Sequence, residues 1–232
     1  MRLFAGTSGF SYPEWRGTFY EAGLPAARML SAYAEKLSTV EINNTFYRMP
    51  KESLLSGWAE QTPKTFSFAL KAPRRITHIG KLKDTEGAVA NLFELAQVMG
   101  ERLGPVLFQL PPFLRKDVGL LTAFCASLPK GARATLEFRH ASWFCDEVYA
   151  ALASAGVALC ACEVDPDEGT GAPFVRTAPF TYVRLRKALY DAASLGAVLE
   201  QIRGLGVEQA FVYFKHEVLG PKYALELRAL SG

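Results

Sequence analysis

Two glutamates stand in short apolar runs, where a charged side chain is unexpected. Glu41 lies in the segment Thr-Val-Glu-Ile-Asn, and Glu137 lies in Thr-Leu-Glu-Phe-Arg. A pair of carboxyl groups in an apolar setting can act as general acid and general base, and a histidine can do so near neutral pH. Glu41, Glu137 and His78 are therefore the predicted catalytic residues. The alternative is structural: the two carboxylates would neutralise neighbouring Arg and Lys side chains in a buried network.

Basic side chains follow the same apolar runs and outnumber the acids there. The predicted substrate-binding cations are Lys71, Arg139, Arg184, Arg186 and Lys215. Guanidinium and ammonium groups in such number favour a ligand that carries phosphate or carboxylate. Asn43 and Gln109 would orient that ligand, and the rings of Tyr47 and Trp143 would contact a base or sugar face.

Further aromatic residues fall in the segments expected to form loops: Phe10, Tyr12, Trp15, Phe19, Tyr20, Phe46 and Phe144. They too could stack on a base or sugar face. The alternative is that they plug one end of the domain as a satellite core. The sequence alone does not separate the two interpretations.

The elements that must position these side chains alternate between strand and helix. Eight short runs rich in β-branched or aromatic residues predict strands at 3–8, 39–43, 66–71, 106–110, 134–139, 157–162, 181–186 and 210–215. In a chain of 232 residues they repeat about every 29 residues, close to the unit of a minimal (β/α)₈ TIM barrel. A doubly wound open sheet is the alternative, but its spaced glycine fingerprint is missing after the first strand.

Helical patterns fill most of the gaps between these strands. One apolar stripe runs from Leu92 to Leu103 and stops at Gly104-Pro105, and similar stripes precede the second and eighth strands. The sixth unit departs from the pattern, because its segment EVDPDEGTGAPFVRTAPF is too rich in Pro and Gly for a helix and predicts an irregular loop over one barrel end. No linker divides the chain, so residues 1–232 are expected to form one α/β domain.

Alternation along the predicted strands indicates where the polar side chains point. Residues two apart on a strand face the same side, so Val40 and Ile42 share one face while Glu41 and Asn43 share the other. Helices must cover the apolar face, which turns the polar face into the barrel. The polar residues stand toward the C-terminal ends of the strands, where barrel enzymes carry their chemistry.

Composition excludes several classes of protein. Half of the residues are apolar and the net charge is +3, so disorder is excluded and global charge does not identify a partner. Four cysteines without a Cys-x-x-Cys pair, and no His-x-His or Asp-rich spacing, predict no metal and no other cofactor. No apolar stretch spans a membrane and no signal-peptide pattern opens the chain, so we expect no membrane partner and a cytoplasmic location. Nothing in the sequence fixes the oligomeric state.

Six motifs stand in a fixed order along the chain: GTSGFSYPEWRGTFY, TVEINNTFYRMP, WAEQTPKTFSFALKAPRRITH, GPVLFQLPP, LEFRHASWF and YVRLR. By these motifs the chain resembles the YecE-like family, domain of unknown function 72, from end to end. The resemblance implies a (β/α)₈ barrel and leaves the reaction unassigned. It also implies functional roles for Glu41, Asn43, Tyr47, Lys71, His78, Gln109, Glu137, Arg139, Ser142 and Trp143.

Two segments depart from the commonest pattern of that family. The seventh strand there ends in Arg-Leu-His-Gly, whereas this chain has Arg-Leu-Arg-Lys at 184–187. The eighth ends there in two asparagines, whereas this chain has Lys215 and His216. An acid common after the sixth strand corresponds to Glu163 or Asp165. The extra basic residues imply a more anionic ligand for this chain.

The leading hypothesis is a barrel enzyme that performs acid/base or hydrolytic chemistry on an anionic small molecule, phosphorylated or nucleotide-like. The first alternative is a protein that binds or processes single-stranded nucleic acid with its basic barrel mouth and aromatic loops. A basic stripe leading outward past Arg74, Arg75, Lys81 and Lys83 would favour it. The second alternative is a ligand-binding protein without catalysis.

Overall fold

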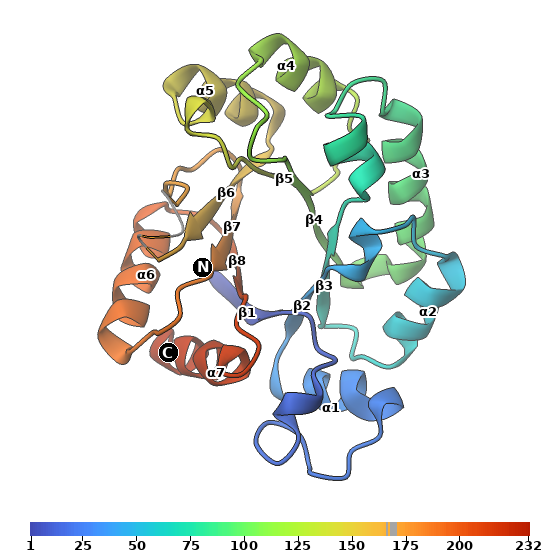
Figure 1. Cartoon of the computed structure of the whole chain (residues 1–232), viewed down its shortest axis with the longest axis vertical. Helices are drawn as coiled ribbons and strands as arrows, with labels where there is room; N and C mark the ends of the chain where they lie inside the picture. Colours follow the sequence, from blue (N-terminus) through green and yellow to red (C-terminus); the bar gives the residue numbers. More distant parts are fainter. Residues whose placement is uncertain (166, 168–170) are drawn as a thin grey trace.

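The chain folds into a closed barrel of eight parallel strands in a computed structural model, which describes residues 1–165, 167 and 171–232. Each strand pairs with its neighbours in sequence, and β1 closes the barrel against β8 (Figure 1). The strands are β1 (Arg2–Ser8), β2 (Thr39–Ile42), β3 (Ser67–Lys71), β4 (Leu103–Gln109), β5 (Ala134–Glu137), β6 (Ala158–Glu163), β7 (Phe180–Leu185) and β8 (Gln209–Phe214). The predicted (β/α)₈ barrel is confirmed.

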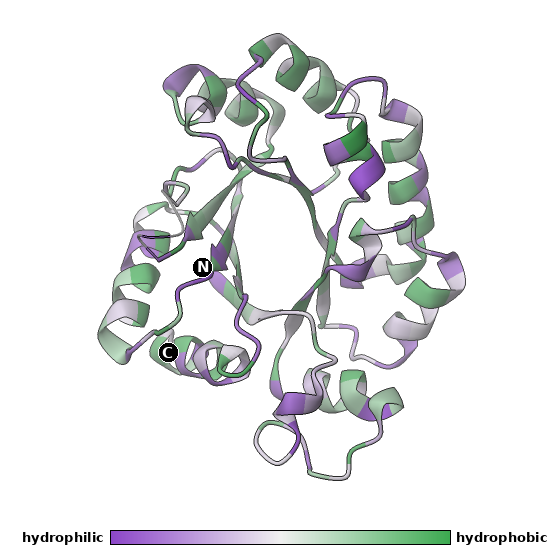
Figure 2. Ribbon diagram, in the orientation of Figure 1, coloured by the Kyte–Doolittle hydropathy of each residue, from purple (hydrophilic) through white to green (hydrophobic). Residues whose placement is uncertain are grey.

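Helices form a ring outside this barrel (Figure 1). The α-helices are α1 (Met29–Lys36), α2 (Glu52–Glu60), α3 (Glu86–Ala96), α4 (Val118–Ala126), α5 (Asp146–Ala155), α6 (Ala192–Gly204) and α7 (Gly220–Leu230). Short helical turns lie between these elements: η1 (Pro13–Trp15), η2 (Ala26–Arg28), η3 (Asn44–Phe46), η4 (Arg75–Ile79), η5 (Gln97–Arg102) and η6 (Ala141–Trp143). Green and purple residues alternate along the helices in Figure 2, as expected when one face of each helix is apolar.

The core has an outer layer and an inner layer, as strand alternation predicts. Val40, Ile42 and Leu70 lie in the outer layer and pack with residues of the surrounding helices. The opposite parity fills the barrel with a cluster that includes Ala69, Leu107, Cys160, Tyr182, Phe211 and Tyr213. The polar side chains at the strand ends continue this inner set, so they face the mouth of the barrel.

The boundary between α3 and β4 differs from the prediction. The helix expected to continue to Leu103 ends at Ala96, and η5 follows it with Gly100 at a φ of +54°. Gly104 and Pro105, expected to stop the helix, lie inside β4. A Cβ at position 104 would meet the side chain of Ser67 and stand 3.0 Å from the carbonyl oxygen of Phe68. Glycine therefore lets β3 and β4 approach each other closely. The apolar spacing predicts a helix up to Leu103, and it gives no indication that residue 104 lies in a strand.

The sixth unit is irregular, as predicted. No α-helix lies between β6 and β7 among the described residues, and Cys162 pairs with Ala172 as an antiparallel bridge instead. Thr177 Oγ1 donates to the carbonyl oxygen of Val157 and accepts from the amide of Leu159, both at 2.8 Å. The loop expected here includes residues 166 and 168–170, which lie outside the described residues.

Candidate active site

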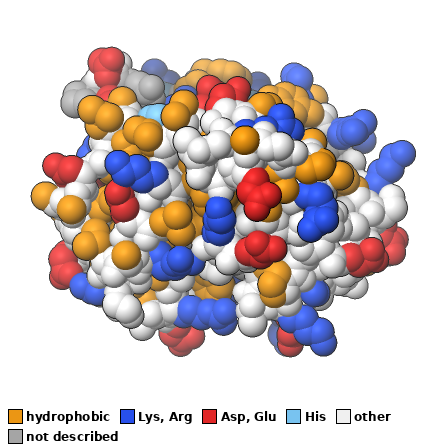
Figure 3. All heavy atoms as spheres, turned by 90° about the horizontal axis from the view of Figure 1, so that it is seen from below, with side chains coloured by type: hydrophobic (Ala, Val, Ile, Leu, Met, Phe, Trp, Pro, Cys, Tyr) orange, Lys and Arg blue, Asp and Glu red, His pale blue; other side chains and the backbone are white. Residues whose placement is uncertain are grey.

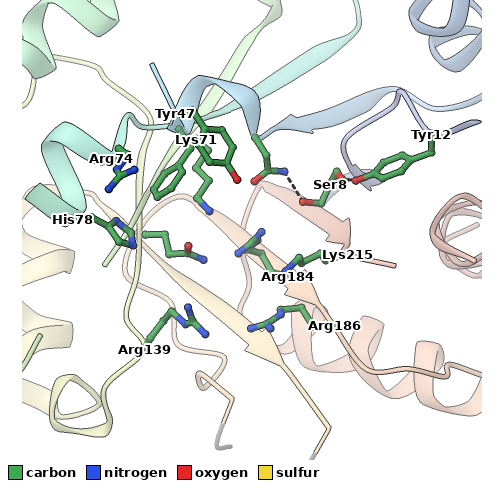
Figure 4. Close-up of a pocket in the computed structure, with 13 residues that line it drawn as sticks. Ser8, Tyr12, Tyr47, Lys71, Arg74, His78, Arg139, Arg184, Arg186 and Lys215 are labelled. Carbon is green, nitrogen blue, oxygen red and sulfur yellow. Dashed lines mark hydrogen bonds between the residues drawn. The ribbon is translucent and has the colours of Figure 1, made fainter. Parts of the chain in front are cut away.

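A cavity of about 510 Å³ opens at the C-terminal mouth of the barrel (Figure 4). Six of its lining residues are basic: Lys71, Arg74, Arg139, Arg184, Arg186 and Lys215. The others are Ser8, Tyr12, Asn43, Phe46, Tyr47, His78 and Gln109. No Asp or Glu lines the cavity among the residues that the structure describes. The mouth is therefore a cationic site, as the sequence predicts.

A buried ion network forms beneath this cavity. Arg184, at the end of β7, donates from Nη2 to Glu41 Oε1 at 3.0 Å and from Nη1 to Glu137 Oε2 at 2.7 Å. The three side chains are no more than 3 % exposed. Glu41 also accepts hydrogen bonds from Ser8 Oγ and, at 2.7 Å, from the hydroxyl of Tyr182. Gln109 Nε2 donates to Glu137 Oε1 at 2.8 Å.

These partners keep Glu41 ionised. Burial acts to raise the pKa of its carboxyl, but Arg184, the hydrogen bonds from Ser8 and Tyr182, and the charge of Lys71 together lower it. Neither Glu41 nor Glu137 lines the cavity. The geometry favours the structural alternative, a buried ion network, and a proton-transfer role for the two carboxylates stays a prediction.

Arg184 belongs both to this network and to the cavity wall. Its two terminal nitrogens hold carboxylates, whereas its Nε is buried without a hydrogen-bond partner in the described part of the chain. A buried donor without a partner costs free energy unless a ligand or water accepts its hydrogen bond. The residue is thus anchored from below while one donor stays unused.

Lys71 is the last residue of β3, and its side chain extends into the centre of the cavity in Figure 4. Its Nζ lies 4.5 Å from the ring centroid of Phe46. Burial, and after it the Arg184 guanidinium, lower the pKa of Lys71 to about 8, although Glu41 and Glu137 act in the opposite direction. Partial burial and the neighbouring Arg186 and Arg184 guanidiniums also lower the pKa of Lys215.

His78 lies in η4, a turn of π-helix that follows β3. Its ring meets Phe46 edge-on at 4.9 Å, and its Nδ1 shares a hydrogen bond of 2.9 Å with Thr77 Oγ1. Burial, and then the positive charges of Lys71, Arg74 and Arg139, lower the pKa of His78. The imidazole is therefore mainly neutral at pH 7, the form that accepts a proton.

The other predicted binding residues gather at the same cavity, with one exception. Asn43, Tyr47, Gln109, Arg139, Arg186 and Lys215 all line it. Trp143 does not: it is fully buried, its ring stacks on Phe138 at 4.4 Å, and its Nε1 donates to the carbonyl oxygen of Leu114 at 2.8 Å. The structure corrects the prediction that Trp143 contacts a ligand, because the ring packs in the core behind β5.

Four lining residues were not among the predicted catalytic and substrate-binding residues: Ser8, Tyr12, Phe46 and Arg74. Tyr12 and Phe46 were among the loop aromatics expected either to stack on a ligand or to form a satellite core. Ser8 lies on the same inward face of β1 as Phe4. Because Phe4 is apolar, the sequence of β1 does not show a polar inward face. Trp15 and Phe19 pack on Tyr33, and Tyr20 packs on both of them, so these rings belong to the outer core. Tyr12, from the same segment, reaches the cavity and donates to the carbonyl oxygen of Ser8 at 2.7 Å.

Within residues 1–165, 167 and 171–232, no three His, Cys, Asp or Glu side chains come together as metal ligands would. The same residues contain no helix with the length and apolar character needed to cross a membrane.

Comparisons with known proteins agree with the fold and the motifs. The chain is 29 % identical over 143 residues to the UPF0759 protein YecE of Escherichia coli K12, and 26 % identical over 155 residues to the UPF0759 protein YunF of Bacillus subtilis. These alignments cover 61 % and 63 % of this chain but 50 % and 54 % of the relatives, so the chain spans about half the length of the curated relatives it matches.

A solved structure shows the same fold over the whole chain. The crystal structure of a DUF72 family protein from Thermotoga maritima superposes with a TM-score of 0.88 at 24 % identity, covering 100 % of this chain and 99 % of that one. Residues 4–232 match the family described as Protein of unknown function DUF72. The chain belongs to this family.

Proposed function

We propose that this barrel is an enzyme that binds an anionic small molecule, phosphorylated or nucleotide-like, at its C-terminal mouth and performs acid/base or hydrolytic chemistry on it. The observation that supports this proposal is the cavity itself: six Lys and Arg side chains line it, and no carboxylate does among the described residues. Its volume of about 510 Å³ suits a small ligand. Cations gathered without matching acids repel one another, and an anion would relieve that repulsion.

The lining residues would bind and orient the ligand according to their chemistry. Arg139 and Arg186 would form paired hydrogen bonds to phosphate or carboxylate oxygens. Arg184 would offer its partnerless Nε from the cavity floor. Asn43 donates to Ser8 Oγ at 2.7 Å and Gln109 donates to Glu137, so both amides are held in place and would orient the ligand.

In this proposal Lys71 and His78 would transfer the proton, in place of the role predicted for Glu41 and Glu137. With a pKa of about 8, Lys71 exchanges a proton near neutral pH. His78 is mainly neutral and touches the same Phe46 ring as Lys71. Glu41 and Glu137 would hold Arg184 and balance the charge beneath the cavity.

Calorimetric titration with phosphate tests the anion site. Saturable binding by the parent protein, at constant ionic strength, is the expected result. Lys215→Gln should weaken it, whereas Lys64→Gln removes the same charge from an exposed position before β3 and should not. Equal binding by both variants would contradict the proposal. Turnover in a screen of phosphorylated compounds would support an enzyme, and phosphate binding without any turnover would favour the non-catalytic alternative.

One observation favours a second candidate function, the binding of single-stranded nucleic acid. A groove of about 960 Å³ shares the walls Tyr47 and Arg74 with the cavity and adds Arg48, Arg75 and Lys83, with Asp84 as an acid. Tyr47 is 73 % exposed at the junction, where a base could stack on its ring.

The loop along this groove holds non-glycine residues with positive φ: Lys81 at +51°, Leu82 at +69° and Asp84 at +53°. Such backbone strain clusters at functional sites. On the face shown in Figure 3, Lys and Arg side chains are interspersed with Asp and Glu.

Fluorescence anisotropy with a short labelled oligonucleotide separates the two functions. If the groove binds single-stranded nucleic acid, the double variant Arg75→Gln/Lys83→Gln should weaken binding. The slope of log affinity against log salt concentration should become shallower by about 0.7 for each lost phosphate contact. The matched control Lys64→Gln/Lys130→Gln removes two charges that precede β3 and β5, away from the groove. Identical affinities for parent and groove variant would remove this candidate.

We also propose the cytoplasm as the compartment. All four cysteines are free, including the buried Cys125, Cys160 and Cys162. Reduced thiols suit a reducing compartment.

A further inference from the structure

Lys71 differs from the lysines that hold carboxylates elsewhere in the described chain. Lys116 and Lys187 each have a glutamate oxygen at 3.0 Å. Lys71 has no ion pair within 4.0 Å among the described residues, although it is half-buried at the centre of the cavity, and its Nζ lies 4.5 Å from the centroid of the Phe46 ring. A central ammonium group without a carboxylate partner is poorly stabilised in its charged form.

We propose that Lys71 is a nucleophile that forms an iminium bond with the aldehyde or ketone carbon of an anionic substrate. This inference rests on the proposed function, because the cations around Lys71 are what would hold the substrate's phosphate or carboxylate. It narrows that function to a substrate class, carbonyl compounds that bear an anionic group.

The surroundings of Lys71 favour the neutral amine that nucleophilic attack requires. Arg184 and Lys215 repel its positive charge, while Glu41 and Glu137, the two acids beneath the cavity, partly compensate. Desolvation beside other cations is a known way to activate a lysine. With a pKa of about 8, Lys71 carries a neutral amine in roughly a tenth of the protein molecules at pH 7.

The proposed step balances without an external oxidant or reductant. The lone pair of Nζ forms a C–N bond to the carbonyl carbon, the π electrons move to oxygen, and oxygen takes up a proton while Nζ releases one. A second proton converts the hydroxyl group to water, which leaves as nitrogen forms the C=N⁺ bond. The sum is amine plus carbonyl plus one proton, giving protonated iminium plus water.

Residues near Lys71 could transfer the protons of this step and stabilise the charge that it creates. Neutral His78, against the same Phe46 ring, would accept the proton that Nζ releases and return it to the departing hydroxyl group. The ionised Glu41 would stabilise the iminium charge from below. Arg139, Arg186 and Lys215 would hold the anionic end of the substrate (Figure 4).

Reductive trapping tests the inference. Pyridoxal 5′-phosphate is an aldehyde that carries a phosphate, and sodium borohydride converts its imine into a stable secondary amine that peptide mapping locates. At limiting reagent and neutral pH, we expect about tenfold or more labelling of Lys71 relative to the exposed Lys64, because the lowered pKa of Lys71 increases the fraction of its neutral amine. Inorganic phosphate should suppress labelling of Lys71 alone, and pyridoxal, which lacks the phosphate, should label it much less.

The outcomes separate this inference from the proposed function. Labelling of Lys71 no stronger than that of Lys64, in a protein that binds phosphate, would overturn the inference and leave the anion site standing. Equal labelling of Lys71 by pyridoxal and its phosphate, without protection by phosphate, would overturn the anionic substrate class. Failure of the parent protein to bind phosphate would overturn the proposed function itself. Mapping on the parent protein decides the matter even if Lys71→Arg fails to fold.

Discussion

Arg184 and Glu41 form an ion pair, Nη2 to Oε1 at 3.0 Å, between strands β7 and β2, which are separated in the barrel by β8 and β1. The same guanidinium holds Glu137 of β5 at 2.7 Å. One side chain thereby links three strands beneath the cavity. Because two carboxylates share one guanidinium, the network has a formal charge of −1 under a mouth lined by other cations.

Loss of Arg184 should destabilise the protein strongly. Arg184→Met would leave two carboxylates buried without their cation, which typically costs about 3 to 5 kcal/mol of the free energy of unfolding. Urea denaturation at neutral pH measures the loss, and the deficit should shrink in acid as the carboxylates take up protons. A variant within about 1 kcal/mol of the parent would show that the network contributes little.

Arg139→Gln should behave in the opposite way. Arg139 is exposed, lines the cavity and has no carboxylate partner within 4.0 Å among the described residues. Its removal relieves repulsion between cations, so the melting temperature without ligand should stay constant or rise slightly. The rise in melting temperature caused by phosphate should shrink. A variant that unfolds far earlier, yet keeps the parent's response to phosphate, would make Arg139 part of the scaffold.

Strand alternation was enough to predict most of the site. A strand fixes which side chains share a face, and a closed barrel leaves only one interior, so Lys71, Gln109 and Arg184 had to converge. The pattern could not reveal which groups bond to each other. Glu41 and Glu137 face the barrel interior as predicted, but they lie beneath the cavity and do not line it. Their engagement by Arg184 depends on side-chain conformations that a sequence does not display.

The errors fall where the chain leaves a strand. Trp143 follows β5 in η6, where His140 Nδ1 accepts from the amide of Ser142 at 3.2 Å and the turn directs the indole inward to Phe138. A residue in a loop has no fixed parity, so its type alone did not show whether it faces the ligand or the core. Phe46 was left open between ligand contact and core, and Arg74 was placed only in the basic stripe of the nucleic-acid alternative, because both lie in turns beyond strand ends.

Acid should weaken the fold through Glu41. Its pKa is lower in the folded protein than the ordinary value of 4.5, so its stabilising contribution is complete above about pH 4.5 and is lost as the pH falls through the folded pKa. The free energy of unfolding of the parent should therefore decline in this range. Glu41→Gln should be less stable at neutral pH and should lose less on acidification. If the free energies of unfolding of the two proteins fell in parallel with pH, Glu41 would not be the origin of the acid sensitivity.

Protein purified without chelator should contain no stoichiometric metal. Within the described residues no cluster of three metal-binding side chains exists, and the sequence has no Cys-x-x-Cys pair. Elemental analysis should find far less than one equivalent of zinc, manganese or iron. Dialysis against a chelator should leave the melting temperature unchanged. About one equivalent of any of these metals would redirect the proposal toward a metal-assisted hydrolase.

Sulfate affinity should fall as the pH rises through the pKa of Lys71. Sulfate does not titrate in this range, so a change in its affinity reports on the protein. As Lys71 loses its proton near pH 8, the cavity loses positive charge and the dissociation constant should increase. The lowered pKa of Lys215 acts in the same direction. Lys71→Arg keeps a charge at all these pH values and should retain more of the affinity above pH 8.

The stability of the ligand-free protein should move in the opposite direction over the same range. The pKa of Lys71 is about 8 in the folded chain against 10.5 for an ordinary lysine, so between these values the unfolded chain binds more protons. The free energy of unfolding therefore rises with pH across this interval, because burying the charged ammonium group no longer penalises the fold. Calorimetric titrations with sulfate and urea denaturation curves, both at constant ionic strength, give the two trends. If affinity and stability rose together, or if Lys71→Arg reproduced both curves of the parent, Lys71 would not be the titrating group in the cavity.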